Sequence, residues 1–586
     1  MNRNVESHFS QLPTSEIERS TFDRSCSYKT SLNCSRVVPF MVDEVLPGDT
    51  FDITTSKVVR SQTLLTPLMD NMYLDTYYFF VPNRLVWKHW REFCGENTTG
   101  PWAPTVEYTI PKIFPPAGGF ASGTLADYMG LPVGVEWKAD DDLAPSALPF
   151  RGYALIMNEF FRDENLSDPL LIPMDDANQQ GTNGDNYISD VANGGMPFRA
   201  AKYHDYFTSA LPSPQKGEAV GVPIAIPGFK GGTFPVTTSA DWSVPDSAIP
   251  AVYGLFTTPT SGTLDGKTSY PVSTGSSGLE KGEKIVVSDG FSAPGPLSAL
   301  VNSRLDYVRN AWTPLNLQTV IPSTGSGDDS TVNFSVNELR LAFAYQRFLE
   351  SLARSGSRYT ELLLGLFGVR SPDARLQRPE YLGGNRVPIS VSEVTNNAQS
   401  EQDFLGDLGA KSSTSDVNHD FVKSFTEHGY LFGLMVIRYD HSYSQGLARF
   451  WTRSTFTDFY NPKFAHLGEV PIYKAEIFAS PETIADKTKV FGYQEIWSDY
   501  RYRPNMVTCE MRPGVQNSLA YWNLADYYAS EPTLSDEWIR EDVSNVDRAL
   551  AVTSAVSNQF WADIYIRNKC TRCMPMYSVP GLIDHF

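Results

Sequence analysis

Short apolar runs, most of them bounded by Pro or Gly, dominate the pattern along this chain. Runs of this length that are rich in Val, Ile, Tyr and Phe are typical of β-strands. The clearest examples are residues 72–81 and 429–439. We predict strands at these two segments and also at 36–42, 50–54, 505–511 and 561–567.

Helical signals are fewer. Residues 85–94, 153–162 and 359–367 read as short helices. Ser335 and Glu338 form a capping box, in which two side chains satisfy free amide groups at a helix start. Apolar residues then recur at the spacing of one helix face and predict a buried stripe: Leu341, Tyr345, Phe348 and Leu352. Gly356 is the expected end of this helix.

The order of these elements suggests a single β-rich body. Strands near both chain ends imply a sandwich or barrel that closes across the sequence, with large insertions. We expect residues 1–35 to form an extended N-terminal arm and 36–586 the β domain, with discontinuous strands. Within it, residues 211–297 are rich in Gly, Pro, Ser and Thr but keep short apolar runs. Those runs favour an ordered surface insertion over a linker.

The chain is acidic, with a formal net charge of -19 over 586 residues. Phosphate binding requires Lys and Arg, so this charge argues against a protein that coats nucleic acid unaided. The amino terminus has no signal-peptide pattern, and no run of about twenty apolar residues exists. Six Cys in so long a chain do not make a disulfide scaffold. We expect a soluble protein, made in a reducing cytoplasm, with no membrane partner.

Several motifs approach the patterns of catalytic or metal sites without completing them. Cys570 and Cys573 have metal-ligand spacing, but structural zinc needs four ligands, so free thiols are the better interpretation. Residues 176–181 begin like a calcium loop but lack part of its ligand set. Residues 290–293 begin like a nucleophile elbow whose second Gly is missing. We expect no catalytic residue, no metal site and no cofactor.

Basic residues gather weakly at both ends of the chain. The candidates are Arg3, Arg19, Arg24, Lys29, Arg567, Lys569 and Arg572. Neighbouring acidic residues leave a small positive excess in each group, which is usual for a solvated surface. The alternative is that these residues face nucleic acid, with Tyr, Phe and Trp offering stacking surfaces. We keep them as candidate DNA-facing positions.

Several longer strings carry a family resemblance. The most specific read QRFLE at 346–350, ARSGSRYTE at 353–361 and SPDARLQRPEYLGG at 371–384. Shorter ones read RSTFDR at 19–24, PGD at 47–49 and YFFVPNRL at 78–85, with a further match at 575–580. In these strings the chain resembles the major capsid proteins of gokushoviruses, small icosahedral single-stranded-DNA bacteriophages of the Microviridae.

The resemblance implies a mainly β fold: an eight-stranded antiparallel jelly roll of the viral capsid type, with long loop insertions and a few short helices. It implies a T=1 icosahedral virion in which sixty copies of the chain enclose circular single-stranded DNA. The family also carries an insertion that forms protrusions at the three-fold axes, for which residues 211–297 are the candidate. Host attachment through a cell receptor would follow from such a position.

Charge and resemblance together imply one more partner. A shell of acidic chains cannot neutralise enclosed DNA by itself, so we expect a small basic DNA-binding virion protein. The virion would be synthesised and assembled in the host bacterial cytoplasm. Two other classes stay open at this point: a β-rich carbohydrate-active enzyme, and another virion component such as a spike or tail protein.

Overall fold

The computed structural model describes most of the chain outside its ends and its central insertion. The described residues are 18–98, 100, 107–138, 141–217, 336–356, 358–395, 406 and 408–577, with short strands at 237–238, 262–264, 267–271, 284–287 and 317–318. By compactness the chain divides into two units, one of residues 1–220 and 340–586 and one of residues 221–339.

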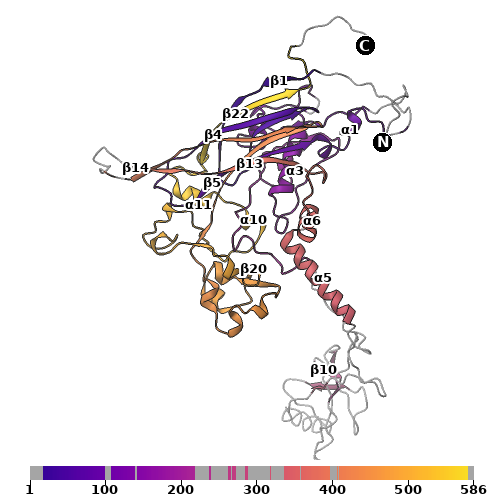
Figure 1. The fold of residues 1–586 in the computed structure, drawn as a ribbon. Helices are drawn as coiled ribbons and strands as arrows, with labels where there is room; N and C mark the ends of the chain where they lie inside the picture. The colour runs from indigo at the N-terminus through magenta and orange to yellow at the C-terminus, as the bar shows by residue number, and fades with distance from the viewer. Residues whose placement is uncertain are drawn as a thin grey trace, which may run out of the picture. The chain divides into compact units, whose positions relative to one another are not determined.

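Two antiparallel sheets form the centre of the first unit (Figure 1). The β22 sheet contains, from one edge to the other, β1 (Ser20–Asp23) and β2 (Cys26–Leu32), β22 (Phe560–Arg572), β4 (Thr50–Ser61) and β16 (Thr414–Ser424). The β17 sheet contains, in order, β13 (Glu380–Pro388), β5 (Met72–Pro82), β17 (Gly429–Tyr439) and β3 (Val38–Val45). The fold is therefore mainly β and has the form of a β-sandwich.

The two sheets face each other across a shared core. Phe51 and Ile53 of β4 and Ile564 of β22 belong to the same buried cluster as Leu431 and Met435 of β17. Polar side chains also cross between the sheets. The hydroxyl groups of Thr55 and Tyr78 lie 2.5 Å apart, and the buried Lys57 Nζ donates to Thr76 at 3.0 Å.

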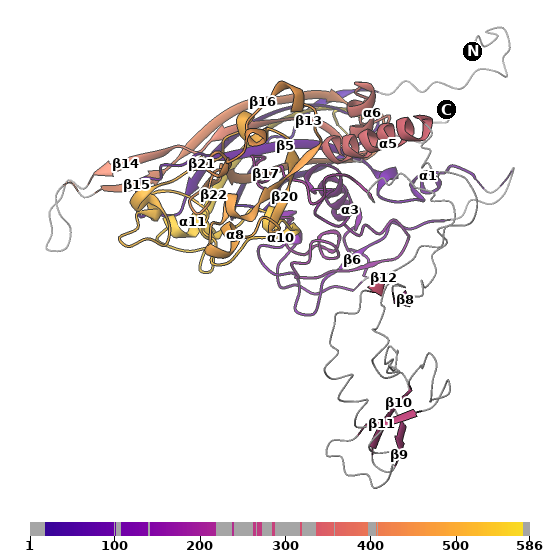
Figure 2. The same cartoon turned by 90° about the horizontal axis from the view of Figure 1, so that it is seen from below.

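The other face of the β17 sheet is covered by α3 (Leu148–Ile156) and the loops around it (Figure 2). Phe432, Leu434 and Val436 of β17 pack there with Phe150 and Tyr153. The β17 sheet is thus buried on both faces, which explains why β17 reads as an unbroken apolar run. The β22 sheet has one buried face, so β22 alternates between buried and exposed residues along its length.

Apart from the 20-residue α5, the remaining elements of the first unit are short. Its helices are α1 (Trp90–Phe93), α2 (Leu125–Tyr128), α5 (Val336–Ser355), α6 (Tyr359–Phe367), α7 (Lys474–Ile477), α8 (Pro481–Ala485), α9 (Ser498–Arg501), α10 (Asp536–Ile539) and α11 (Ser544–Ala549), α5 beginning just before the unit boundary. Its small ladders pair β6 (Ile113–Phe114) with β7 (Gln179–Gln180), β14 (Val391–Thr395) with β15 (Leu408–Ser412), β18 (Ser442–Tyr443) with β21 (Asn505–Met506), and β19 (Glu469–Tyr473) with β20 (Val490–Glu495).

Five short strands are described in the second unit. An antiparallel sheet contains β11 (Lys284–Val287), β10 (Lys267–Pro271) and β9 (Gly262–Leu264), and a separate ladder pairs β8 (Thr237–Thr238) with β12 (Leu317–Gln318). The expected insertion at 211–297 overlaps this unit, although most of its residues lie outside the described ones. Leu211 itself pairs with Tyr493 in the first unit.

Several predicted elements differ in extent. The helix expected at 85–94 is a 3₁₀ turn, Asn83–Leu85, followed by the single turn α1. The helix expected at 153–162 begins five residues earlier as α3, with a proline in its first turn, and continues as a π-helix, Met157–Phe161. The strand expected at 505–511 is present only as Asn505–Met506; further along, Cys509 has a positive φ of 56° and begins a 3₁₀ turn, Cys509–Met511, which is not extended backbone.

The apolar stripe on α5 gives a larger discrepancy. The helix is present and ends before Gly356, as predicted, whereas Ser335 lies outside the described residues. Leu341, Tyr345 and Phe348 are exposed and Leu352 is only half-buried, so the prediction of a buried stripe is wrong for the single chain. The residues of α5 that are buried, Leu349 and Ala353, lie on the adjacent face of the helix.

The core between the sheets gives a first prediction. Phe51 is fully buried and packs edge-on against Phe425, with ring centroids 5.8 Å apart. Phe51→Ala should lower the free energy of unfolding by about 3–5 kcal/mol, measured by urea denaturation of the purified subunit. Val417→Ala, on the exposed face of β16, should change it by less than about 0.5 kcal/mol. Equal effects of the two substitutions would contradict the proposed core.

Candidate nucleic-acid interface

The exposed face of the β22 sheet brings together basic residues from both ends of the chain. Arg567 and Lys569 project from β22 on the same side as Tyr565 because alternate residues of a strand share a face. Lys29 joins them from the neighbouring β2 and forms an ion pair of 3.3 Å with Asp563. This face therefore contains three of the seven candidates together with an aromatic ring.

Acidic residues are interleaved with these cations. Lys569 pairs in register with Asp23 on β1 and Asp52 on β4. Hydrogen bonds from Ser25 lower the pKa of Asp23, and the charges of Lys569 and Arg567 lower it further. The face is consequently mixed in charge, not strongly positive.

Two of the other candidate residues form ion pairs within the chain. Arg24 forms two hydrogen bonds with Asp43 on β3, at 2.6 and 2.8 Å. Arg572 lies 3.1 Å from Asp49, whose carboxylate is fully buried, and donates to the carbonyl of Glu44. Arg19 is exposed just before β1. Arg3 lies outside the described residues.

Sequence reasoning missed part of this face. Trp561 and Tyr565 are half-exposed on β22, and Arg60 of β4 pairs in register with Trp561. The alternation along 560–572 was the signal that could have identified the outward residues of β22. Nothing in the sequence indicated that Arg60 would lie beside them, because the pairing of β22 with β4 joins segments about 500 residues apart.

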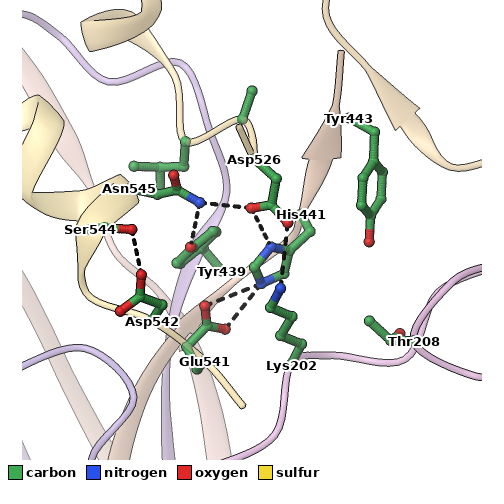
Figure 3. Close-up of polar contacts among 12 residues, drawn as sticks. Lys202, Thr208, Tyr439, His441, Tyr443, Asp526, Glu541, Asp542, Ser544 and Asn545 are labelled. Carbon is green, nitrogen blue, oxygen red and sulfur yellow. Dashed lines mark hydrogen bonds and ion pairs between the residues drawn. The ribbon is translucent and has the colours of Figure 1, made fainter. Parts of the chain in front are cut away.

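A second polar assembly is buried at the end of β17 (Figure 3). The Nδ1 atom of His441 lies 2.9 Å from Asp526, and its Nε2 atom lies 3.1 Å from Glu541. Lys202 approaches Asp526 at 3.5 Å, and Asn545 donates to the same carboxylate at 2.7 Å. These five residues come from four separate segments of the chain.

The charge state of this assembly follows from its geometry. Both ring nitrogens of His441 face carboxylates, so both must donate and the imidazole is positively charged. Burial alone would lower the pKa of His441, but Asp526 and Glu541 raise it to about 10. The positive charges of His441 and Lys202 therefore balance the negative charges of Asp526 and Glu541 inside the protein. The assembly is closed to solvent and serves to join segments of the fold.

A cavity of about 660 Å³ lies between the β17 sheet and the α5–α6 junction. Two of its carboxylates, Glu164 and Glu361, share a hydrogen bond, and burial followed by the charge of Glu164 raises the pKa of Glu361. Glycosidases hold their two carboxyl groups about 5 Å or more apart, so this pair does not fit that reaction. Asp75 nearby is bound by Arg386 and Arg438.

Residues of the two incomplete metal-site motifs make structural contacts within the protein. Cys570 belongs to the core between the sheets, and Cys570 and Cys573 are both free thiols. Asp176 accepts a hydrogen bond of 2.7 Å from the indole of Trp87 and pairs with His89, so its oxygens are engaged by the protein. Among the described residues, no group of three or more His, Cys, Asp or Glu is arranged to hold a metal ion.

The fold and its polar sites define the class of protein as a β-sandwich whose buried charges join distant segments of the chain. Comparison with known proteins specifies the class. The chain belongs to the phage capsid protein family described as "Capsid protein (F protein)", whose profile matches residues 10–582. Members of this family are structural proteins of the virion, so this chain is a capsid subunit and not an enzyme.

Individual relatives agree with the family match. The chain is 37% identical to capsid protein VP1 of Chlamydia phage 1, an alignment that covers 99% of this chain and 98% of the relative. It is 36% identical to capsid protein VP1 of Spiroplasma virus 4, covering 98% and 97% of the two chains. It is 35% identical to capsid protein VP1 of Bdellovibrio phage phiMH2K, covering 100% and 99%.

These matches confirm the resemblance to gokushovirus capsid proteins and exclude both the carbohydrate-active enzyme and the spike or tail protein. They agree with the absence, within the described part of the chain, of any helix long and apolar enough to cross a bilayer.

The buried charge assembly gives a second prediction. The folded-state pKa of His441 is raised from 6.5 to about 10, so its stabilisation is complete below pH 6.5 and is lost as pH rises toward 10. The free energy of unfolding should fall by roughly 2–5 kcal/mol over that range. His441→Gln should cost about 3–5 kcal/mol at pH 6.5 because buried carboxylates lose their partner, and should flatten the pH dependence.

The matched control is His419→Gln, since His419 lies on the exposed face of β16. Its effect should stay below about 0.5 kcal/mol at every pH. A His441→Gln subunit with wild-type stability and wild-type pH dependence would show that the assembly is not the charged network described above.

Proposed function

We propose that this chain is the self-assembling subunit of a T=1 icosahedral virion, in which sixty copies enclose circular single-stranded DNA. The observation that carries the proposal is the family match, which spans residues 10–582 and therefore includes both sheets. Membership in a capsid family implies assembly with further copies of the same chain. The number of copies and the nature of the genome are the parts that go beyond the match.

The order of the strands supports an eight-stranded jelly roll. With β1 set aside, the eight long strands in chain order are β2, β3, β4, β5, β13, β16, β17 and β22. One sheet then contains the first, eighth, third and sixth strands, and the other contains the fifth, fourth, seventh and second. Two interlocked Greek keys produce this arrangement, as in viral capsid domains.

The exposed face of the β22 sheet is the surface that we propose for the genome. Lys29, Arg567 and Lys569 can bind phosphates, and Tyr565 and Trp561 offer rings on which bases can stack. Arg24 and Arg572 are less suited because their charges are already neutralised by Asp43 and Asp49. Arg3 and Arg19 would contribute from the N-terminal segment that precedes β1 in the sequence, the part of the expected arm that does not belong to the sheet.

The mixed charge of this face supports a separate basic partner. Its cations are interleaved with Asp23, Asp52 and Asp563, and the chain as a whole has a net charge of -19. Such a surface cannot offset the phosphates of a confined genome. A small basic DNA-binding virion protein would supply the missing charge, with assembly in the host bacterial cytoplasm.

Residues 211–297 are proposed as the surface insertion that meets a host-cell receptor. Loops that project from a rigid scaffold commonly carry binding functions. The Gly, Pro, Ser and Thr content of this segment is that of such a loop region.

Electron microscopy tests the proposed assembly. Particles purified from infected cells should show icosahedral symmetry with sixty copies of this chain, and filled particles should contain a second, Lys- and Arg-rich polypeptide. A chain that stays monomeric at high concentration over a wide range of salt would contradict self-assembly. Stable filled particles without a basic polypeptide would contradict the proposed partner.

Binding of single-stranded DNA tests the proposed interface. Arg567→Gln combined with Lys569→Gln should weaken binding of an oligonucleotide by the unassembled subunit. The slope of log K against log salt should become shallower by about 1.4, or about 0.7 for each lost phosphate contact. Lys463→Gln, at an exposed lysine outside this face, should leave the slope unchanged. An unchanged slope in the double variant would place the genome contact elsewhere.

A further inference from the structure

Helix α6 is almost wholly apolar and yet contributes nothing to the core. Its sequence is YTELLLGLF, and none of its residues is buried in the single chain. Phe367 is 73% exposed, and Tyr359 is 66% exposed. Large apolar side chains left in water forgo the favourable free energy of removing apolar area from solvent.

Helix α5 extends the same apolar surface. Its Leu349 and Ala353 pack against the first unit, while Leu341, Tyr345 and Phe348 on the adjacent face stay exposed, Leu341 at 70%. These three residues recur at i, i+4 and i+7, the spacing of a helix face that packs against another surface, while Phe343, also exposed, lies outside this stripe. The helix therefore has two apolar faces, and the chain uses only one of them.

The two helices are fixed to the body by polar contacts. Arg358, between them, donates to the carbonyl groups of Asn158 and Arg162, both at 2.9 Å. Arg378 donates to Thr360 of α6 at 2.9 Å, and Arg354 of α5 forms an ion pair with Glu469. The apolar side chains are thus held in place without being covered, which is the property of a preformed contact surface.

We infer that the exposed faces of α5 and α6 form a contact surface that a second copy of this chain covers. The inference rests on the proposed shell assembly, since capsid subunits associate with copies of themselves. The surface is rich in Phe and Tyr, which are enriched in the centres of protein interfaces. An uncovered patch of this kind would otherwise promote aggregation.

Repetition in a closed shell fits this role. A stable isolated pair of proteins usually buries about 800 Å² on each partner. A shell repeats each contact in every subunit and adds other contacts, so the two helices need not supply a whole interface alone. The helices would therefore stay uncovered in the free subunit and become buried only on assembly.

Charged substitutions test the inference in the full-length chain. Phe348→Glu and Phe367→Glu should each reduce shell yield at least tenfold by electron microscopy and sedimentation, while the melting temperature of the free subunit stays at the wild-type value. Arg347→Glu introduces the same side chain on α5 outside the stripe and should assemble normally. Wild-type shell yield from both Phe variants would overturn the inference and leave the proposed function intact.

Photo-crosslinking identifies what covers the surface. A benzoyl-phenylalanine at position 348 or 367 should join two copies of the chain, giving a band of twice the subunit mass. Crosslinks confined to residues 221–339 of the same chain would overturn the inference, because the insertion would then be the occupant. If the wild-type chain forms no shells, the proposed function fails. Crosslinking at high protein concentration still decides whether a second copy of the chain or residues 221–339 of the same chain covers the surface.

Discussion

The pairing of β22 with its two neighbouring strands is the interaction on which the rest of the structure depends. β22 lies between β2 and β4 and places Ala562, Ile564 and Ile566 in the core. Residue 32 pairs with residue 560, so the sheet closes only when the two ends of the chain meet. Bringing such distant segments together costs loop-closure entropy, which the burial of the shared core must offset. The long insertions between strands are tolerated because this cost grows slowly with loop length.

Internal ion pairs determine what the charged residues are free to do. Arg438 and Arg386 are bound to Asp75, Arg24 to Asp43, and His441 to two carboxylates at once. The chain has 48 Lys and Arg against 67 Asp and Glu. Each basic residue that forms an ion pair inside the fold therefore leaves fewer positive charges on the surface. An acidic capsid subunit built in this way is poorly matched to a polyanion.

The subunit divides its apolar residues between two purposes. Those of the sheets and α3 are buried within one chain, whereas those of α5 and α6 remain at its surface. The apolar spacing along a helix indicates that one of its faces is to be covered, and not which molecule covers it. This is why Leu341, Tyr345 and Phe348 were predicted correctly as one face and wrongly as part of the core of the single chain.

The sequence by itself determined the mainly β class, the capsid family, the bounds of β17 and α6 and those of β5 to within one residue, because each depends on residues that are adjacent in the chain. Local signals were weaker at 505–511, where only Asn505 and Met506 pair as a strand, with β18, and Cys509–Met511 form a 3₁₀ turn. The basic candidates illustrate the same limit. Their positions were visible in the sequence, but only the sheet register separated Arg567 and Lys569, which face outward, from Arg24 and Arg572, which are neutralised within the chain. The ion pairs of His441 were invisible for the same physical reason: a charge is buried or exposed according to which distant segments surround it, and only the tertiary structure brings those segments together.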